Sequence, residues 1–236
     1  MTIDEIIADV PKDKIFHREP AGVIICADCL EILPLLPEKS IDLVLTDPPY
    51  GIGETGNKNA SRGCLAISRN YNYANWDKRP NGTCFNEIYR VSINQIIWGG
   101  NYFVEDLKDS SGWLVWDKDN GKTDFADCEL AYTSFKIAAR KIKHRWQGML
   151  QEYMGKQKEL RCHLTQKPLR LIRWCISEID GRLGDAGSRT ILDPFLGSGT
   201  TAVAAKQLGR KFIGIEKKPK YCQIAVERLR QEELPL

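Results

Sequence analysis

Residues 191–216 read ILDPFLGSGTTAVAAKQLGRKFIGIE, and this stretch decides the fold class. A short apolar run ends at Asp193, a glycine-containing turn and a helical stretch follow, and a second apolar run ends in Glu216. Two strands joined through a helix are the repeating unit of a parallel sheet. Glycines let the backbone approach a ligand closely, and a carboxylate at the end of the next strand can hold two ribose hydroxyls. The stretch therefore indicates a site for a nucleoside-containing cofactor, either a nicotinamide dinucleotide or S-adenosylmethionine, with a plain strand-to-helix turn as the alternative.

A second turn, Asp47-Pro48-Pro49-Tyr50, directly follows the apolar run IDLVLT at residues 41–46. Two consecutive prolines fix φ and remove two N–H donors, so the turn is stiff. Ligands of parallel sheets bind at the carboxyl ends of the strands. Asp47 and the Pro48 carbonyl can accept the two hydrogens of an amino group on a planar base, while Tyr50 stacks on the ring. The alternative is a purely structural turn with Tyr50 packed inward.

Short apolar runs alternate with helical stretches along the rest of the chain, which predicts an α/β fold with a doubly wound, mostly parallel sheet. Because no linker divides the sequence, we expect one domain over residues 1–236, with irregular insertions at 51–79 and 135–162. The strands are predicted at 22–26, 41–46, 95–98, 113–116, 190–193 and 211–216, and the helices at 29–36, 81–92, 168–179, 199–208 and 219–232.

Composition excludes several classes of protein. Hydrophobic residues make up 42% of the 236 residues and charged residues 28%, which is typical of a globular protein rather than a disordered one. With 34 Lys and Arg against 31 Asp and Glu, the net charge is +3, which excludes a histone-like basic protein. No apolar run approaches the roughly 18 residues that cross a bilayer, and the N-terminus lacks the residue order of a secretory signal. We expect a cytoplasmic protein with no membrane partner.

The eight cysteines are expected to be reduced thiols. Cys26 and Cys29 form one CxxC pair, but no second CxxC or HxxxH completes a zinc site. The sequence therefore predicts no metal centre.

Positive charge is concentrated in one segment. Residues 136–161 hold eight basic and two acidic residues, a net charge of +6 (8 − 2). A second stretch interleaves basic residues with the aromatic residues Tyr71, Tyr73 and Trp76. Cations and flat rings suit phosphates and unstacked bases, although a solvated surface has the same composition. The candidate DNA-binding residues are Arg62, Arg69, Arg140, Lys141, Lys143 and Arg145.

Taken together, the two turns make the chain resemble the amino-group DNA methyltransferases, in the β-class order in which the catalytic DPPY precedes the cofactor loop. The resemblance extends over residues 22–229. It implies a Rossmann-like fold that binds S-adenosylmethionine. The matching motifs are ICADCLEILPLLPEKSIDLVLTDPPYG (25–51), IIWGGNYF (96–103), LVWDKDNGKTDFADCELAYTSF (114–135), HLTQKPLRLIRWCI (163–176) and DPFLGSGTT (193–201).

The same resemblance assigns roles to individual residues. It implies that Asp28 accepts a hydrogen bond from the cofactor adenine, that Glu216 binds the ribose, and that Thr165 and Lys167 meet the methionine carboxylate. Lys167 also supplies a cation at a helix start, where an anion is favoured. The turn residues implied to line the cofactor site are Asp193, Phe195, Gly197, Ser198, Gly199 and Thr200, and the catalytic residues are Asp47, Pro48, Pro49 and Tyr50.

The expected reaction is methyl transfer from S-adenosylmethionine to the N6 amino group of an adenine flipped out of double-stranded DNA. By resemblance, Asp47 favours adenine, because related cytosine-amino enzymes usually have Ser at this position. Residues 135–162 correspond to the target-recognition region of β-class enzymes. Enzymes of this kind serve restriction–modification systems, phages or solitary marking of DNA, and the sequence does not choose among these roles. Many β-class relatives pair as dimers, so a homodimer is one expectation, and any restriction endonuclease partner is expected to be a separate protein.

Other functions stay open at this stage. The same turn chemistry serves methylation of the cytosine N4 amino group, of RNA or of a protein amide. A non-catalytic DNA-binding protein can also keep the cofactor fold. A nicotinamide-dependent enzyme would share the glycine turn and Glu216 but would not explain the Asp47–Tyr50 turn.

Overall fold

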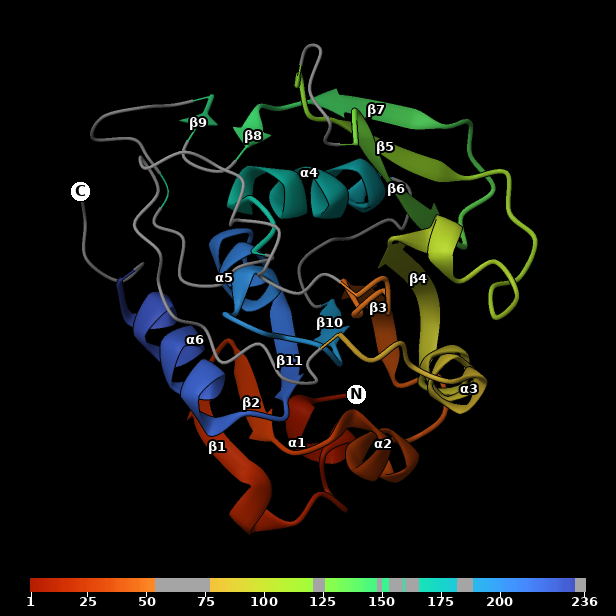
Figure 1. The fold of residues 1–236 in the computed structure, drawn as a ribbon. Helices are drawn as coiled ribbons and strands as arrows, with labels where there is room; N and C mark the ends of the chain where they lie inside the picture. The colour runs from red at the N-terminus through yellow and green to blue at the C-terminus, as the bar shows by residue number, and fades with distance from the viewer. Residues whose placement is uncertain are drawn as a thin grey trace.

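The computed structural model describes residues 1–53, 77–120, 126–147, 150–152, 159, 166–181 and 189–231 (Figure 1). Within these ranges a nine-stranded sheet has the order β1-β2-β11-β10-β3-β4-β6-β5-β7, and β8 and β9 form a separate ribbon. The strands are β1 (Ile15–Glu19), β2 (Gly22–Cys26), β3 (Ile41–Thr46), β4 (Ser92–Trp98), β5 (Trp113–Asp117), β6 (Cys128–Thr133), β7 (Arg140–Lys143), β8 (Trp146–Gln147), β9 (Leu150–Gln151), β10 (Thr190–Asp193) and β11 (Lys211–Glu216).

Helices cover both faces of the sheet (Figure 1). The α-helices are α1 (Ile3–Ile6), α2 (Cys29–Ile32), α3 (Gly82–Val91), α4 (Leu169–Asp180), α5 (Thr200–Gln207) and α6 (Pro219–Gln231), and the 3₁₀ turns are η1 (Lys12–Lys14), η2 (Leu33–Leu35) and η4 (Gly100–Tyr102). Residues of α4, α5 and α6 belong to one hydrophobic core, and residues of α1, α2 and α3 belong to the other. The predicted doubly wound α/β fold is confirmed.

The central strands are apolar throughout because they are buried on both faces. In β2, Ile24 packs in the core beneath α4–α6, whereas Val23 and Ile25 pack in the core beneath α1–α3. This alternation follows from the two-residue repeat of a strand. No helix within the described ranges is long and apolar enough to span a membrane.

Strand order places the two turns side by side. β10 lies between β3 and β11 and runs parallel to both. The chain continues from β3 to β4 on one side of β10, while β11 and β2 lie on the other, so the sheet has a topological switch point here. Ligands of open α/β sheets bind at such a point. The hydroxyl of Thr46, at the end of β3, donates to Asp193 Oδ1 at the end of β10 (2.7 Å).

The structure confirms the predicted central strands and corrects the prediction at the edges. Strands β2, β3, β10 and β11 have the predicted bounds. The helix predicted at 29–36 is α-helical only to Ile32 and continues as η2, which contains Pro34 near its start. The elements that were not predicted from the sequence are α1, β1, β6, β7 and the β8–β9 ribbon. β1 and β7 are edge strands with a mixture of charged and apolar residues, so they lack the continuous apolar run of a doubly buried strand.

Candidate active site

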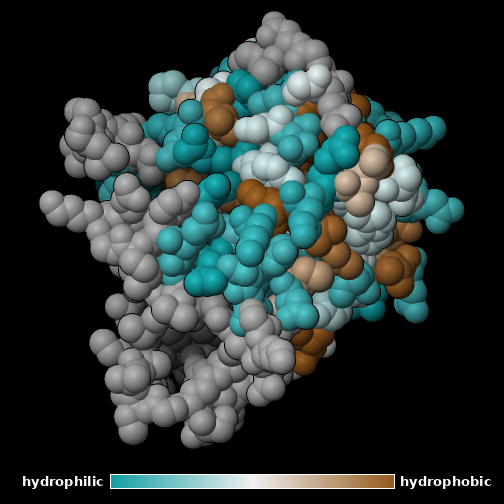
Figure 2. Space-filling view, turned by 90° about the horizontal axis from the view of Figure 1, so that it is seen from above, coloured by the Kyte–Doolittle hydropathy of each residue, from teal (hydrophilic) through white to brown (hydrophobic). Residues whose placement is uncertain are grey.

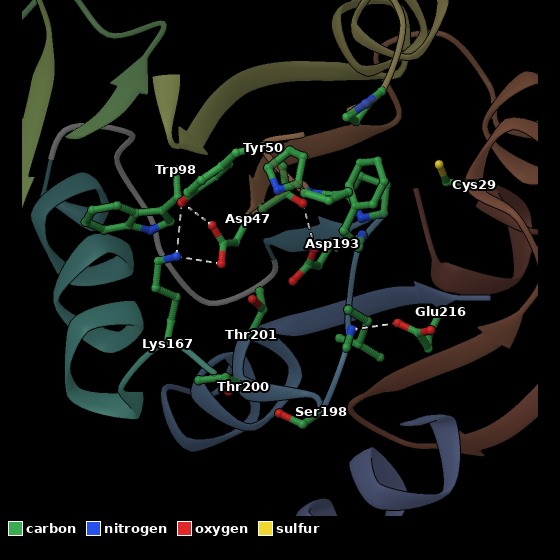
Figure 3. Close-up of a pocket in the computed structure, with 18 of the residues that line it drawn as sticks. Cys29, Asp47, Tyr50, Trp98, Lys167, Asp193, Ser198, Thr200, Thr201 and Glu216 are labelled. Carbon is green, nitrogen blue, oxygen red and sulfur yellow. Dashed lines mark hydrogen bonds and ion pairs between the residues drawn. The ribbon is translucent and has the colours of Figure 1, made fainter. Parts of the chain in front are cut away.

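Both predicted turns line one cavity of about 680 Å³ at the carboxyl ends of the parallel strands. The cavity extends from the end of β11 to the β5–β6 region beyond β4. The predicted site residues that line it are Asp28, Asp47, Pro48, Pro49, Tyr50, Lys167, Asp193, Phe195, Gly197, Ser198, Thr200 and Glu216. Two residues far apart in the sequence, Asp47 and Glu216, therefore face the same space (Figure 3).

Two predicted cofactor residues are not among the cavity residues that the structure describes. Thr165 lies outside the described ranges. Gly199 has a φ of +86°, and a Cβ atom on it would lie 2.6 Å from Cβ of Ala225 in α6. Glycine at this position therefore allows α5 to begin close against α6.

Glu216 organises the glycine turn. Its Oε2 accepts a hydrogen bond from the Gly197 N–H (2.9 Å), and its Oε1 accepts one from the Lys218 N–H (2.8 Å). Gly197 itself has a φ of +53°, a conformation that favours glycine. Burial raises the pKa of the Glu216 carboxyl above its usual value. The carboxylate is held rigidly at the end of β11, where a ribose acceptor was predicted.

Arg228, which the sequence analysis missed, supports the same turn from α6. Its guanidinium donates to the Ser198 carbonyl (2.9 Å), the Ser198 hydroxyl (3.2 Å) and the Thr200 hydroxyl (2.9 Å). An arginine within an amphipathic helix carries no sequence signal for this contact.

Asp28, which also lines the cavity, makes two local interactions through its carboxylate. Its Oδ1 caps α2 by accepting from the Leu30 N–H (3.0 Å), and its Oδ2 pairs with Lys217 Nζ (2.8 Å). The hydrogen bond from Lys217 lowers the pKa of Asp28.

Asp193 links the ends of the two central strands. Its Oδ1 accepts from the Thr46 hydroxyl (2.7 Å) and from the Phe195 N–H (3.0 Å). Burial raises the pKa of Asp193 to about 6. The carboxyl therefore fixes the geometry between the Asp47–Tyr50 turn and the glycine turn.

Within the Asp47–Tyr50 turn, the Tyr50 hydroxyl donates to Asp47 Oδ1 (2.7 Å). The Tyr50 ring stacks on Tyr102, with centroids 4.7 Å apart and an interplanar angle of 19°, and packs edge-on against Phe103. Burial raises the pKa of both Asp47 and Tyr50. The tyrosine is thus fixed against the protein and also borders the cavity.

Lys167 lies at the Asp47 turn. Its Nζ is 2.5 Å from Asp47 Oδ2 and 3.2 Å from the Tyr50 hydroxyl (Figure 3). It also lies 3.2 Å from Glu129 Oε2. The resemblance implied a contact with the methionine carboxylate of the cofactor, whereas the ammonium group in this structure pairs with Asp47 and Glu129.

The far part of the cavity is lined mostly by residues of the motifs at 96–103 and 114–135, which resemble pocket-wall segments of the family and had no individual roles assigned. The lining residues here are Trp98, Trp116, Lys118, Asn120, Glu129 and Trp146. Trp98 and Trp116 pack edge to face with centroids 6.3 Å apart, and Lys118 pairs with Glu129. Glu129 is the sequence signal that could have been used, because it interrupts the otherwise apolar strand β6 with a carboxylate.

Gly99 makes room for the Tyr50 ring, and we expect Gly99→Ala to displace it. Gly99 has a φ of +69°, and an added Cβ would lie 2.1 Å from Tyr50 Cε1. Overpacking costs roughly 1–3 kcal/mol, and the left-handed backbone costs about a further 1–3 kcal/mol for a non-glycine residue. We expect a lower free energy of unfolding in urea. Because the resemblance implies that Tyr50 is a catalytic residue, we also expect at least a roughly tenfold loss of methyl-transfer turnover, since misplacing a catalytic group by about 1 Å can cost about 100-fold.

Gly209→Ala is the matched control. Gly209 has a φ of +67°, and an added Cβ would meet no atom within 4 Å. This variant should lose stability through the backbone alone and keep its turnover. Equal activity losses in both variants would show that Gly99 does not act through Tyr50.

The basic residues of β7 lie at the opposite edge of the sheet from β1. Lys141 pairs with Asp117 (3.4 Å), and Lys143 and Arg145 pair with Asp119 (2.9 and 2.7 Å). The described part of the face seen in Figure 2, above β5 and β7 in Figure 1, is mostly hydrophilic. Arg140 is exposed, while Arg62, Arg69, Tyr71, Tyr73 and Trp76 lie outside the described ranges.

Comparison with known proteins gives consistent matches. The sequence pattern of the DNA methylase family matches residues 115–227. Type II methyltransferase M2.LlaDCHI from Lactococcus lactis subsp. cremoris is 26% identical over 92% of both chains, and type II methyltransferase M2.DpnII from Streptococcus pneumoniae is 27% identical over 93% of both.

Two solved structures illustrate the shared fold. The structure of the M1.HpyAVI–SAM complex aligns with a TM-score of 0.54 at 23% identity and covers 88% of this chain and 98% of that chain. The PvuII cytosine-N4-specific DNA methyltransferase aligns with a TM-score of 0.61 at 18% identity and covers 94% and 91%. These structural likenesses support the fold, and the sequence matches make the chain similar to DNA methyltransferases, with the family pattern extending over residues 115–227.

Proposed function

We propose that this protein transfers a methyl group from S-adenosylmethionine to the N6 amino group of adenine in double-stranded DNA. The observation that carries the proposal is the shared cavity: the Asp47–Tyr50 turn and the glycine turn before α5 line the same space. One turn is suited to an amino-bearing base and the other to a nucleoside.

The residues around the glycine turn fit S-adenosylmethionine. Glu216 is a fixed carboxylate acceptor at the end of β11, and Phe195 offers an apolar surface in the same wall. Two solved structures with this fold, of M1.HpyAVI and of TTHA0409 from Thermus thermophilus, are complexes with S-adenosylmethionine. When bound, this cofactor supplies a methyl group on a positively charged sulfur, which is already activated for transfer.

The protein contributes position and hydrogen-bond acceptors. The lone pair of an exocyclic amino nitrogen is delocalised into the ring, which makes the nitrogen a weak nucleophile. Asp47 and the Pro48 carbonyl would accept the two amino hydrogens and favour a more tetrahedral nitrogen. Tyr50, held by Tyr102 and by its bond to Asp47, would hold the base ring in place. Because a base inside a duplex cannot reach this cavity, we include base flipping in the proposal.

Adenine is proposed over cytosine because of Asp47, following the resemblance stated above. Nucleoside mass spectrometry tests this choice directly. DNA incubated with the purified protein and S-adenosylmethionine should yield N6-methyldeoxyadenosine. N4-methyldeoxycytidine as the product would overturn the choice of adenine, and unmodified DNA would overturn the proposed function.

The basic residues in and directly after β7 are proposed to bind DNA phosphates. Replacing Lys141, Lys143 and Arg145 together with Gln should weaken DNA binding and flatten its salt dependence. The slope of log affinity against log salt should fall by about 0.9 for each phosphate that the variant no longer neutralises. Since Asp117 and Asp119 already pair with these cations, we expect a change equivalent to about one to two phosphates, measured by fluorescence anisotropy at several salt concentrations.

The 3₁₀ turn η1 and the edge strand β1, at the opposite edge of the sheet, provide a matched control. Lys12, Lys14 and Arg18 carry the same three charges, and Lys14 and Arg18 are likewise paired with carboxylates. Their replacement by Gln should leave the salt slope at the wild-type value. Equal changes in both triple variants would mean that only net charge matters.

The type II names of M2.LlaDCHI and M2.DpnII favour a role in restriction–modification. We propose a separate endonuclease as the partner in such a system. The homodimer implied by resemblance stays a prediction, as do the insertions at 51–79 and 135–162.

A further inference from the structure

The far side of the Asp47 turn contains four buried or half-buried charges that form a chain. Lys118 pairs with Glu129, Glu129 Oε2 lies 3.2 Å from Lys167 Nζ, and Lys167 Nζ lies 2.5 Å from Asp47 Oδ2. This row of ion pairs joins three regions of the sequence. Asp47 follows β3, Lys118 and Glu129 belong to the β5–β6 region, and Lys167 lies just before α4. The two positive and two negative charges give this cluster a net charge of zero.

The side chains that form these ion pairs are largely shielded from water. The side chain of Lys167 is only 9% exposed, and those of Asp47 and Glu129 are 23% and 22% exposed. Charges in such surroundings are stable only when they are paired. The rings of Tyr50 and Trp98 also lie against the ammonium group, 5.5 and 5.9 Å from Nζ to the ring centroids. Lys167 therefore has one well-defined position, at Asp47.

We propose that Lys167 and Glu129 are positioning residues for methyl transfer: Lys167 holds the Asp47 carboxylate in its charged, amino-accepting form, and Glu129 holds Lys167 in place. This inference rests on the proposed function, because it assumes that Asp47 accepts the amino hydrogens of the base. A carboxylate has about four lone-pair positions. Lys167 and the Tyr50 hydroxyl take one on each oxygen, which leaves acceptor capacity for the base.

Lys167 and Glu129 shift the pKa of Asp47 in opposite directions. Burial raises the pKa of Asp47, Lys167 lowers it, and Glu129 raises it. The Tyr50 hydroxyl also lowers this pKa by its hydrogen bond, and Asp193 is a second carboxyl close enough for mutual repulsion. Removing the positive charge should therefore shift the titration of Asp47 upward, and removing the charge of Glu129 should shift it downward.

The test compares Lys167→Met, Glu129→Gln and the double variant. Activity requires ionised Asp47 and is lost as pH falls through its pKa, so the acidic limb of kcat/KM follows this group. Lys167→Met should move the limb to higher pH by roughly one unit or more, and Glu129→Gln should move it to lower pH. The double variant removes one charge of each sign and should return the limb toward the wild-type position. Lys167→Arg keeps the charge and should restore most of the wild-type profile.

A second readout needs no turnover. Carbon-13 NMR of the Asp47 carboxyl, assigned with Asp47→Asn, follows the same titration in the free protein. Lys220→Met and Glu38→Gln are controls for the two substitutions, because both residues are exposed, and neither variant should shift the titration.

The outcomes distinguish a failure of the positioning roles of Lys167 and Glu129 from a failure of the proposed function. Opposite NMR shifts in the two single variants support the inference, whatever base is methylated. Shifts of the same sign, or unshifted titrations, overturn it even in a fully active enzyme. Opposite shifts in a protein that methylates no DNA overturn the proposed function instead.

Discussion

Replacing Asp47 with Ala should reduce methyl transfer by at least about 10³-fold while leaving cofactor affinity within about twofold of wild type. Asp47 is the carboxylate of the turn, and loss of a preorganised acceptor or proton-transfer group typically costs about 10²–10⁴ in turnover. Glu216, which is proposed to bind the ribose, belongs to a different strand and keeps its own hydrogen bonds. Turnover is measured with labelled cofactor, and affinity by calorimetry.

In Asp47→Ala, Lys167 loses its ion pair with Asp47, which affects the stability of the variant. Breaking a buried ion pair by removing one partner costs about 3–5 kcal/mol. Asp47→Asn is therefore the second variant, because it keeps the shape and one acceptor oxygen. Both variants should bind cofactor and fail to methylate. Substantial turnover in either would remove Asp47 from the proposed mechanism.

Replacing Glu216 with Ala should weaken S-adenosylmethionine binding by roughly 100-fold. Hydrogen bonds to a charged group contribute about 1.5–3 kcal/mol each, and a ribose offers two hydroxyls to this carboxylate. The substitution also removes the acceptor for the Gly197 and Lys218 N–H groups, so the glycine turn loses its anchor. Isothermal calorimetry measures the affinity directly.

Glu227→Ala serves as the control for this substitution, because Glu227 is an exposed residue of α6 that accepts a hydrogen bond from Gln223 on the same helix. It should bind cofactor like the wild type. With saturating cofactor, Glu216→Ala should recover much of its turnover, since Asp47 is intact. Unchanged affinity in Glu216→Ala would exclude the carboxylate as a ribose ligand.

The central sheet could be predicted from the sequence because its strands are buried on both faces. Such strands are continuous apolar runs, as in GVIIC at 22–26 and KFIGIE at 211–216. The turns that follow β3 and β10 could also be predicted from the sequence, because proline and glycine favour specific backbone conformations. Edge strands such as β7 (RKIK) depend on pairing with β5, which a local pattern does not encode.

The partners of the site residues could not be predicted in the same way. Lys167 pairs with Asp47 across 120 positions of sequence, and Thr46 donates to Asp193 across 147. These contacts arise from strand order, which places β10 beside β3. Glu129 and Arg228 were missed for the same reason, because each acts on a turn formed by a distant part of the chain.

A crystal structure with sinefungin, in which an amine-bearing carbon replaces the methyl sulfonium of the cofactor, tests the shared cavity most directly. The ribose hydroxyls should lie within hydrogen-bond distance of Glu216, and the amine should point across the cavity toward Asp47 and Tyr50. An analogue bound with its amine directed away from Asp47, or bound outside this cavity, would contradict the account.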